Sequence, residues 1–291
     1  MGMGLLKQRG QALKSACLGS TSPRLLFHWS DDQRSSAFPR RVAPVIALLV
    51  LLPMLAACGH SADRIPPATG TGKRVDPATA GTIAGRVVLS GAPPRTSNVK
   101  MSADAFCERA NPGQAASDET AIVGADGALQ NVFVYVKDGL SAYRFDTPRQ
   151  PVRFEQKGCR FGPHVFGMQV GQPLELVNQD ETLHNVHAIA RVNEEFNVGA
   201  VEHQSITRTF AAPEVMITFK CDVHSWMTAY AGVVPHPYFA VTAADGRFEM
   251  KGLPPGDYLI EAWHEKFGTR TERIRIGPKE NKAIAFTFTA R

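Results

Sequence analysis

Cys221-Asp222-Val223-His224-Ser225-Trp226-Met227 places a thiol, an imidazole and a thioether within seven residues. Two more imidazoles lie upstream, in the run His184-Asn185-Val186-His187. One thiolate, two imidazoles and a weakly held thioether make up the ligand set of a blue-copper site. The two stretches therefore predict that the chain binds copper through Cys221, His224, Met227 and one upstream histidine.

The spacing Cys-x2-His-x2-Met, preceded by His-Asn-Val-His, resembles the ligand pattern of the cupredoxins and most closely that of amicyanins. The run Val170–Asn178 is similar to the family's strand before the first copper histidine, and the resemblance departs at Gly158–Pro163, where this chain carries Cys159. It implies an all-β, Greek-key β-sandwich over residues 151–235 that binds one type 1 copper ion. The ligands that it implies are His184, Cys221, His224 and Met227.

The same resemblance implies roles for residues around the ligands. Asn185 would tie the two ligand loops together, with its backbone N–H near the thiolate. His224 would lie near the surface, in an apolar patch through which electrons enter and leave. Trp226 would contribute to that patch, with plain packing as the alternative.

The remaining histidines are expected to be structural. On a strand, side chains alternate faces, so His184 and His187 cannot both reach one ion without a bend. On a helix they would share a face and could suit zinc, but the β-rich surroundings favour the strand. His187 is therefore expected in the domain interior. His164 is expected in a loop, with an approach to the site as the alternative. The isolated histidines are expected to have structural roles: His203, His236 and His264.

The five cysteines fall into separate classes. Cys107 and Cys159 are candidates for a disulfide, which would leave Cys221 free, as a metal ligand must be. The alternative for Cys221 is a buried, inert thiol. Cys17 lies in the leader, and Cys58 follows a short apolar run.

Residues 1–57 resemble a bacterial lipoprotein signal peptide. Arg40-Arg41 precede the apolar run Val42–Ala57, which is too short for a comfortable membrane span. The run ends in Leu55-Ala56-Ala57-Cys58, so Cys58 is the expected lipidation site. Residues 58–80, rich in Pro, Gly, Thr and Ala, are expected to form a flexible linker. The implied location is the periplasmic side of the cell envelope, with the outer membrane favoured over the inner.

A second β-sandwich is expected on either side of the copper domain. The run Val241–Tyr258, with Asp245-Gly246 and Pro254-Pro255-Gly256, resembles the carboxypeptidase regulatory-like, transthyretin-like module. The usual opening of that module matches Ile83–Val87 instead, and the segment after residue 236 is short for a core of its own. Residues 81–150 and 236–291 therefore predict one sandwich, with the copper domain inserted; two sandwiches in series are the alternative. Outside the strands, only Met101–Ala110 favours a short helix.

Charge and motifs narrow the class of function. Residues 1–57 carry seven Lys/Arg and two Asp/Glu, and the rest of the chain carries 25 of each sign, so we expect no nucleic-acid partner. No catalytic constellation is present in the sequence, and we expect no enzyme. The expected function is electron transfer with a periplasmic redox partner; the alternatives are a copper carrier or chaperone and a non-redox adhesion or scaffold protein.

Overall fold

The structure is a computed structural model of the chain, and it describes residues 72–112 and 116–290. The predicted signal peptide and Cys58 lie outside these residues. The described fold is all-β, as expected, with a single short α-helix. No helix in the described ranges has the length and apolar character needed to cross a membrane.

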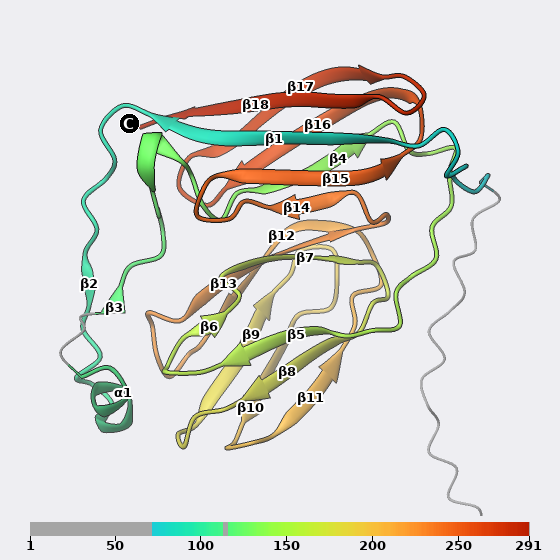
Figure 1. The fold of residues 1–291 in the computed structure, drawn as a ribbon. Helices are drawn as coiled ribbons and strands as arrows, with labels where there is room; N and C mark the ends of the chain where they lie inside the picture. The colour runs from blue at the N-terminus through green and yellow to red at the C-terminus, as the bar shows by residue number, and fades with distance from the viewer. Residues whose placement is uncertain (1–71, 113–115, 291) are drawn as a thin grey trace, which may run out of the picture. The chain divides into compact units, whose positions relative to one another are not determined.

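Strands from both ends of the described chain form the first sandwich, here called the outer sandwich (Figure 1). One sheet has the order β15-β1-β18 and the other the order β14-β4-β16-β17. Apolar side chains of the two sheets meet in one core, which includes Val87, Val134 and Ile260. The strands are β1 (Gly81–Ser90), β4 (Phe133–Asp138), β14 (Phe239–Val241), β15 (Arg247–Leu253), β16 (Gly256–His264), β17 (Gly268–Ile276) and β18 (Asn281–Thr289).

The strands between β4 and β14 in sequence form a second sandwich, here called the central sandwich. Its sheets have the orders β10-β9-β12-β13-β7 and β11-β8-β5-β6. A separate core fills it, with Phe154 and Phe219 among its largest buried side chains. The strands are β5 (Val152–Gln156), β6 (Phe161–Gly162), β7 (Val165–Gln169), β8 (Leu174–Asn178), β9 (His184–Ile189), β10 (Phe196–Ala200), β11 (Ser205–Arg208), β12 (Glu214–Lys220) and β13 (Thr228–Val234).

Strands that precede the central sandwich in the sequence pair with strands that follow it. β1 pairs antiparallel with β15 and parallel with β18, and β4 pairs with β14 and β16. A third apolar cluster, which includes Phe133 and Val165, draws side chains from both sandwiches. Gly232 of β13 is required there, because a Cβ at this position would lie 2.4 Å from the Phe133 ring. The domain boundaries drawn from the sequence stay predictions.

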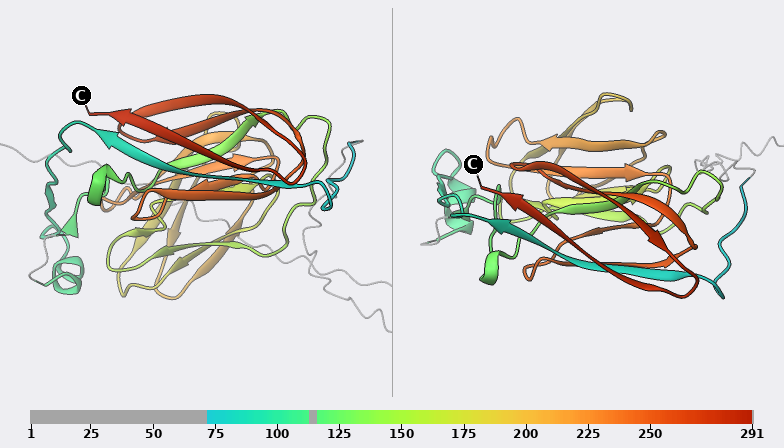
Figure 2. Two further views of the ribbon diagram at one scale, coloured as in Figure 1. Left: turned by 45° about the horizontal axis from the view of Figure 1, so that its top comes forward. Right: turned by 90° about the horizontal axis from the view of Figure 1, so that it is seen from above.

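The connection from β1 to β4, residues 91–132, is here called the strap. It leaves the outer sandwich and carries β2 (Asn98–Val99), α1 (Ala105–Ala110), β3 (Ala116–Ser117) and the 3-10 helix η1 (Ala125–Gly127) (Figures 1 and 2). Met101 and Cys107 of the strap are buried in the core of the central sandwich. The helix expected within Met101–Ala110 is α1, and Asp104 caps it by accepting the backbone N–H groups of Phe106 and Cys107.

Candidate metal centre

Three of the predicted ligands meet at one end of the central sandwich. His184 opens β9, Cys221 directly follows β12, and His224 lies in the loop from β12 to β13. β9 and β12 are paired neighbours, so their ends bring the first two residues together. The loop closes on itself through two backbone hydrogen bonds, from Cys221 N–H to Met227 C=O at 3.1 Å and from Met227 N–H to His224 C=O at 2.9 Å.

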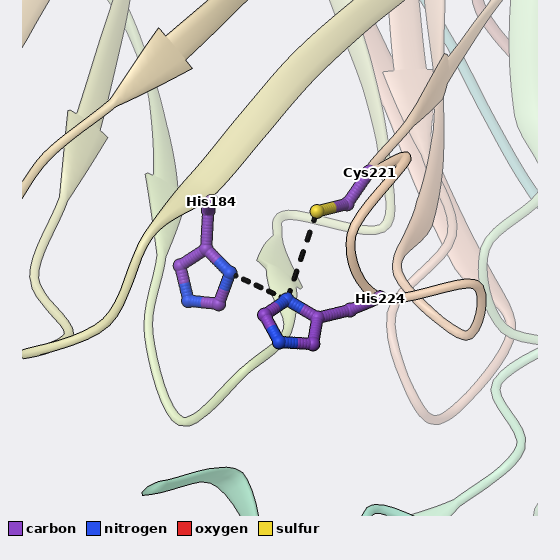
Figure 3. A group of neighbouring side chains, drawn as sticks. All are labelled: His184, Cys221 and His224. Carbon is purple, nitrogen blue, oxygen red and sulfur yellow. Dashed lines mark hydrogen bonds between the residues drawn. The ribbon is translucent and has the colours of Figure 1, made fainter. Parts of the chain in front are cut away.

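The donor atoms of these side chains converge (Figure 3). His184 Nδ1 lies 2.9 Å from His224 Nδ1, and Cys221 Sγ lies 3.7 Å from the same His224 nitrogen. Donors bound to one ion at about 2.0 Å for nitrogen and about 2.3 Å for sulfur lie roughly 3–4 Å apart. All three residues are buried. The separations and the donor types therefore fit a single soft transition-metal ion.

A buried carboxylate holds His184 in place. Asp180 Oδ2 lies 2.9 Å from His184 Nε2, so the ring donates its Nε2–H and presents Nδ1 to the centre. Asp180 is itself fixed, because it accepts the backbone N–H groups of Gly158 and Cys159, each at 2.7 Å. Desolvation acts to lower the pKa of His184, but the hydrogen bonds with Asp180 and Cys221 outweigh it and raise the pKa to about 9.

The Cys221 sulfur lies in an environment that favours a thiolate. Burial acts to raise the pKa of the Cys221 thiol, yet His184 and nearby backbone N–H groups, that of Asn185 included, lower it to about 7. Asn185 joins the two ligand segments. Its Oδ1 accepts the Asp222 backbone N–H at 2.7 Å and lies 3.2 Å from Cys221 Sγ.

Met227 and Trp226 flank the donors. Met227 is buried in the core of the central sandwich, and its role as a ligand stays a prediction. Trp226 is half-buried, its ring centroid lies 5.1 Å from that of His224, and its Nε1–H donates to the Cys159 carbonyl at 3.0 Å. Its indole N–H therefore holds the segment that carries Cys159.

His224 is not near the surface, contrary to the expectation from the sequence. The residue is 1% exposed. Its Nε2 lies 3.3 Å from Asp104 Oδ2 and 3.6 Å from Cys107 Sγ. Both of these belong to the strap, which covers the ring edge that was expected at the surface. The expectation was wrong because the sequence does not reveal that the part of the strap around α1 packs against this end of the central sandwich.

Cys107 and Cys159 form a disulfide, and Cys221 is the free cysteine of the described residues. The bond joins α1 to the loop between β5 and β6. It fixes the strap next to both histidines, since Cys107 contacts His224 and Cys159 N–H binds the partner of His184.

His187 and His164 lie away from the donors. His187 is half-exposed rather than interior, and it contacts Glu195 and Asp222. The side chain of His187 is 23% exposed, which the residue pattern of a single strand does not reveal. His164, between β6 and β7, binds Glu265 and the Thr228 carbonyl, and it belongs to none of the metal-capable groups.

Sequence reasoning missed two carboxylates, Asp104 and Asp180. Hydrogen bonding to the Cys107 backbone N–H, helped by His224, holds the pKa of Asp104 below its usual value, and the pKa of Asp180 is lowered despite its burial. Asp180 lies four residues before His184, in a polar loop that could have been searched for such a partner. Asp104 is readable as a helix cap, but its contact with a residue 120 positions away is not.

Comparison with protein-family models and with curated proteins finds no match. Among solved structures, a copper-containing nitrite reductase from Thermus scotoductus SA-01 is 23% identical over 30% of this chain and 23% of its own, with a TM-score of 0.28. A purple cupredoxin from Nitrosopumilus maritimus is 16% identical over 28% of this chain and 97% of its own, with a TM-score of 0.25. An amicyanin variant in its reduced state is 20% identical over 28% of this chain and 81% of its own, with a TM-score of 0.26. The chain thus spans less than a quarter of the nitrite reductase, and the assignment of a metal rests on the donor atoms themselves.

Proposed function

We propose that this site binds one copper ion as a type 1 centre and that the protein carries single electrons rather than catalysing a reaction. The observation that supports this most directly is the convergence of His184 Nδ1, His224 Nδ1 and Cys221 Sγ in a buried position. Two imidazoles and a thiolate with a weak axial thioether suit copper. Bound copper would supply a one-electron couple, and Met227 would be the fourth ligand.

The chain's own residues keep the donors in one arrangement. Asp180 orients His184 through its Nε2–H, and Asn185 ties the cysteine loop to β9. Such outer partners tune a metal site and are nearly as important as its ligands. A rigid donor set limits the rearrangement between oxidation states, which is what electron transfer requires. The cover over His224 also supports retention of the ion rather than its release to an acceptor.

Copper loading of the purified protein tests the proposal. We expect one copper per chain, intense blue absorption and a reversible one-electron couple in voltammetry. Cys221→Ser should abolish the colour, because the colour needs a thiolate bonded to Cu(II). Rapid loss of copper to a competing chelator would instead favour a carrier, and failure to bind copper would favour an adhesion or scaffold protein.

Two variants on the same strand provide a matched pair. His184→Ala should weaken copper binding and change the spectrum, whereas His187→Ala, three residues along and bound to surface carboxylates, should leave the spectrum nearly unchanged.

Met227→Leu should keep both copper and colour, because an axial bond is long and weak, and should raise the reduction potential. If His187→Ala lost the blue colour while His184→Ala kept it, the ligand assignment would be wrong.

The cellular setting belongs to the same proposal. The protein would be held by a lipid on Cys58 at the periplasmic side of a bacterial envelope, with the outer membrane favoured over the inner, and would exchange electrons with a periplasmic redox protein. The outer sandwich would be a carboxypeptidase regulatory-like module without chemistry of its own. Metabolic labelling with a fatty acid tests the anchor: Cys58→Ser should lose the label, while Cys17→Ser should keep it. Equal labelling of both variants would exclude the lipid anchor.

A further inference from the structure

The strap supplies a carboxylate to the second ligand histidine. Asp104 Oδ2 lies 3.3 Å from His224 Nε2, and Cys107 Sγ, a disulfide sulfur and therefore a weak acceptor, lies 3.6 Å from the same nitrogen. The imidazole Nε2–H therefore donates to Asp104, which leaves Nδ1 as the nitrogen that faces Cys221 and His184.

Asp104 is held firmly in this position. Its other oxygen, Oδ1, accepts the N–H groups of Phe106 and Cys107 at 2.8 and 3.0 Å as the cap of α1. The disulfide to Cys159 fixes α1 one turn later. Thr182 Oγ1 lies 3.4 Å from the Oδ2 atom that faces His224. The carboxylate is therefore positioned by the fold of the strap and not by chance contact on the surface.

The two ligand histidines consequently have equivalent partners. Asp180 binds His184 Nε2 and Asp104 binds His224 Nε2, so each imidazole carries a carboxylate on the nitrogen that faces away from the centre. A carboxylate partner makes an imidazole a stronger donor. Negative charge close to the buried rings also favours the more positive ion, with less screening by solvent at Asp180 than at Asp104, whose side chain is 24% exposed. Both effects stabilise Cu(II) more than Cu(I).

We propose that Asp104 is a positioning residue that lowers the reduction potential of the metal centre by binding His224 from the disulfide-anchored strap. This inference rests on the proposed copper function and adds a direction to it: the reduced centre is a good electron donor. The same contact keeps a partner protein from touching His224 directly, so electrons leave across the strap.

Asp104→Asn is the informative variant. Asparagine is as good a helix cap as aspartate, so its Oδ1 can keep the bonds to α1. Its amide –NH2 then faces the Nε2–H of His224, and two donors cannot bond. Asp104→Ser also keeps a capping oxygen but is too short to reach His224. Glu108→Gln is the matched control, because it removes a negative charge from the exposed side of the same helix.

Voltammetry of the copper-loaded protein gives the main readout. We expect both Asp104 variants to weaken Cu(II) binding about tenfold while changing Cu(I) binding little. That ratio raises the potential by about 59 mV for a one-electron couple. Glu108→Gln should shift the potential far less. A second readout is the His224 Nε2–H resonance in the NMR spectrum of the Cu(I) protein, which should be slow to exchange in the wild type and lost in both variants.

Two failures are distinguishable. If the wild type shows no reversible one-electron couple, the proposed function fails and this role fails with it. If the couple is present but Asp104→Asn and Glu108→Gln shift it equally, only the role of Asp104 is overturned. Unchanged melting temperatures for the variants would show that the shift does not come from loss of α1.

Discussion

The pKa values of buried histidines are shifted in opposite directions in the two sandwiches. In the outer sandwich, His236 and His264 each accept through Nδ1 a backbone N–H two residues later. Desolvation lowers the pKa of both to about 4, so they stay neutral. In the central sandwich, His184 is as deeply buried, but Asp180 and Cys221 raise its pKa to about 9 against the effect of desolvation.

The difference shows what separates a structural histidine from a candidate ligand. Burial alone produces a neutral core side chain with local backbone bonds. A ligand set also needs a second donor and a charged partner brought in from other segments of the chain. Among the described residues, every group of side chains able to hold a metal belongs to the central sandwich and the strap. Four experiments would break or sharpen this contrast.

The largest effect is expected from removing the disulfide with Cys107→Ala and Cys159→Ala together. The bond joins residues separated by 52 positions in the sequence. From chain entropy alone, removing it should lower the free energy of unfolding by about 4 kcal/mol. Hydrogen exchange should quicken first in α1 and in β5 and β6, where the strap is anchored. Equal acceleration throughout β15–β18 would show that the two sandwiches unfold as one unit.

The next effect concerns acid and the outer sandwich. Because the folded pKa of His264 lies near 4 and the unfolded value near 6.5, the unfolded chain binds more protons between these values. The neutral His264 side chain therefore makes its full contribution to the free energy of unfolding above pH 6.5. This contribution, roughly 3 kcal/mol, is lost as the pH falls to about 4. Urea unfolding at several pH values, followed by hydrogen exchange of β16–β18, measures this loss.

His264→Asn is the control for that measurement. An asparagine oxygen can replace Nδ1 as the acceptor of the Lys266 N–H and does not titrate. The variant should therefore show a shallower loss of stability between pH 6.5 and 4, and an unchanged slope would mean that His264 is not held neutral. His236 should retain its own share of the dependence.

Several parts of this picture were readable from the sequence, for stated physical reasons. The all-β class followed from β-rich runs separated by Gly and Pro turns, and strand alternation correctly separated His184 from His187. The cover on His224 was not readable. It depends on a strap whose contacts join Asp104 to a residue 120 positions later, and only the assembled sheets set that distance.

Metal loading should act on one sandwich alone. A ligand present at about one hundred times its dissociation constant stabilises the folded state by about 2.7 kcal/mol. Protection from hydrogen exchange should therefore rise in β9, in β12 and in the loop that follows it, and not in β16–β18. Cys221→Ser should lose this protection, whereas His264→Asn should keep it. Equal protection of both sandwiches on loading would indicate binding outside the proposed centre.

The smallest effect separates two buried polar side chains, one in each sandwich. Thr242 of the outer sandwich is satisfied, since its hydroxyl donates to the Leu129 carbonyl at 2.7 Å and accepts the Val132 N–H at 3.0 Å. Gln156 of β5 is fully buried, and neither atom of its amide has a hydrogen-bond partner among the described residues. A buried polar group without a partner is destabilising, whereas removing one partner from a satisfied bond costs about 1–3 kcal/mol.

Gln156→Met keeps the volume and should raise the free energy of unfolding by about 1 kcal/mol, while Thr242→Val should lower it. Denaturation of the two variants beside the wild type measures both signs, and a loss of stability in Gln156→Met would mean that the central core depends on that amide.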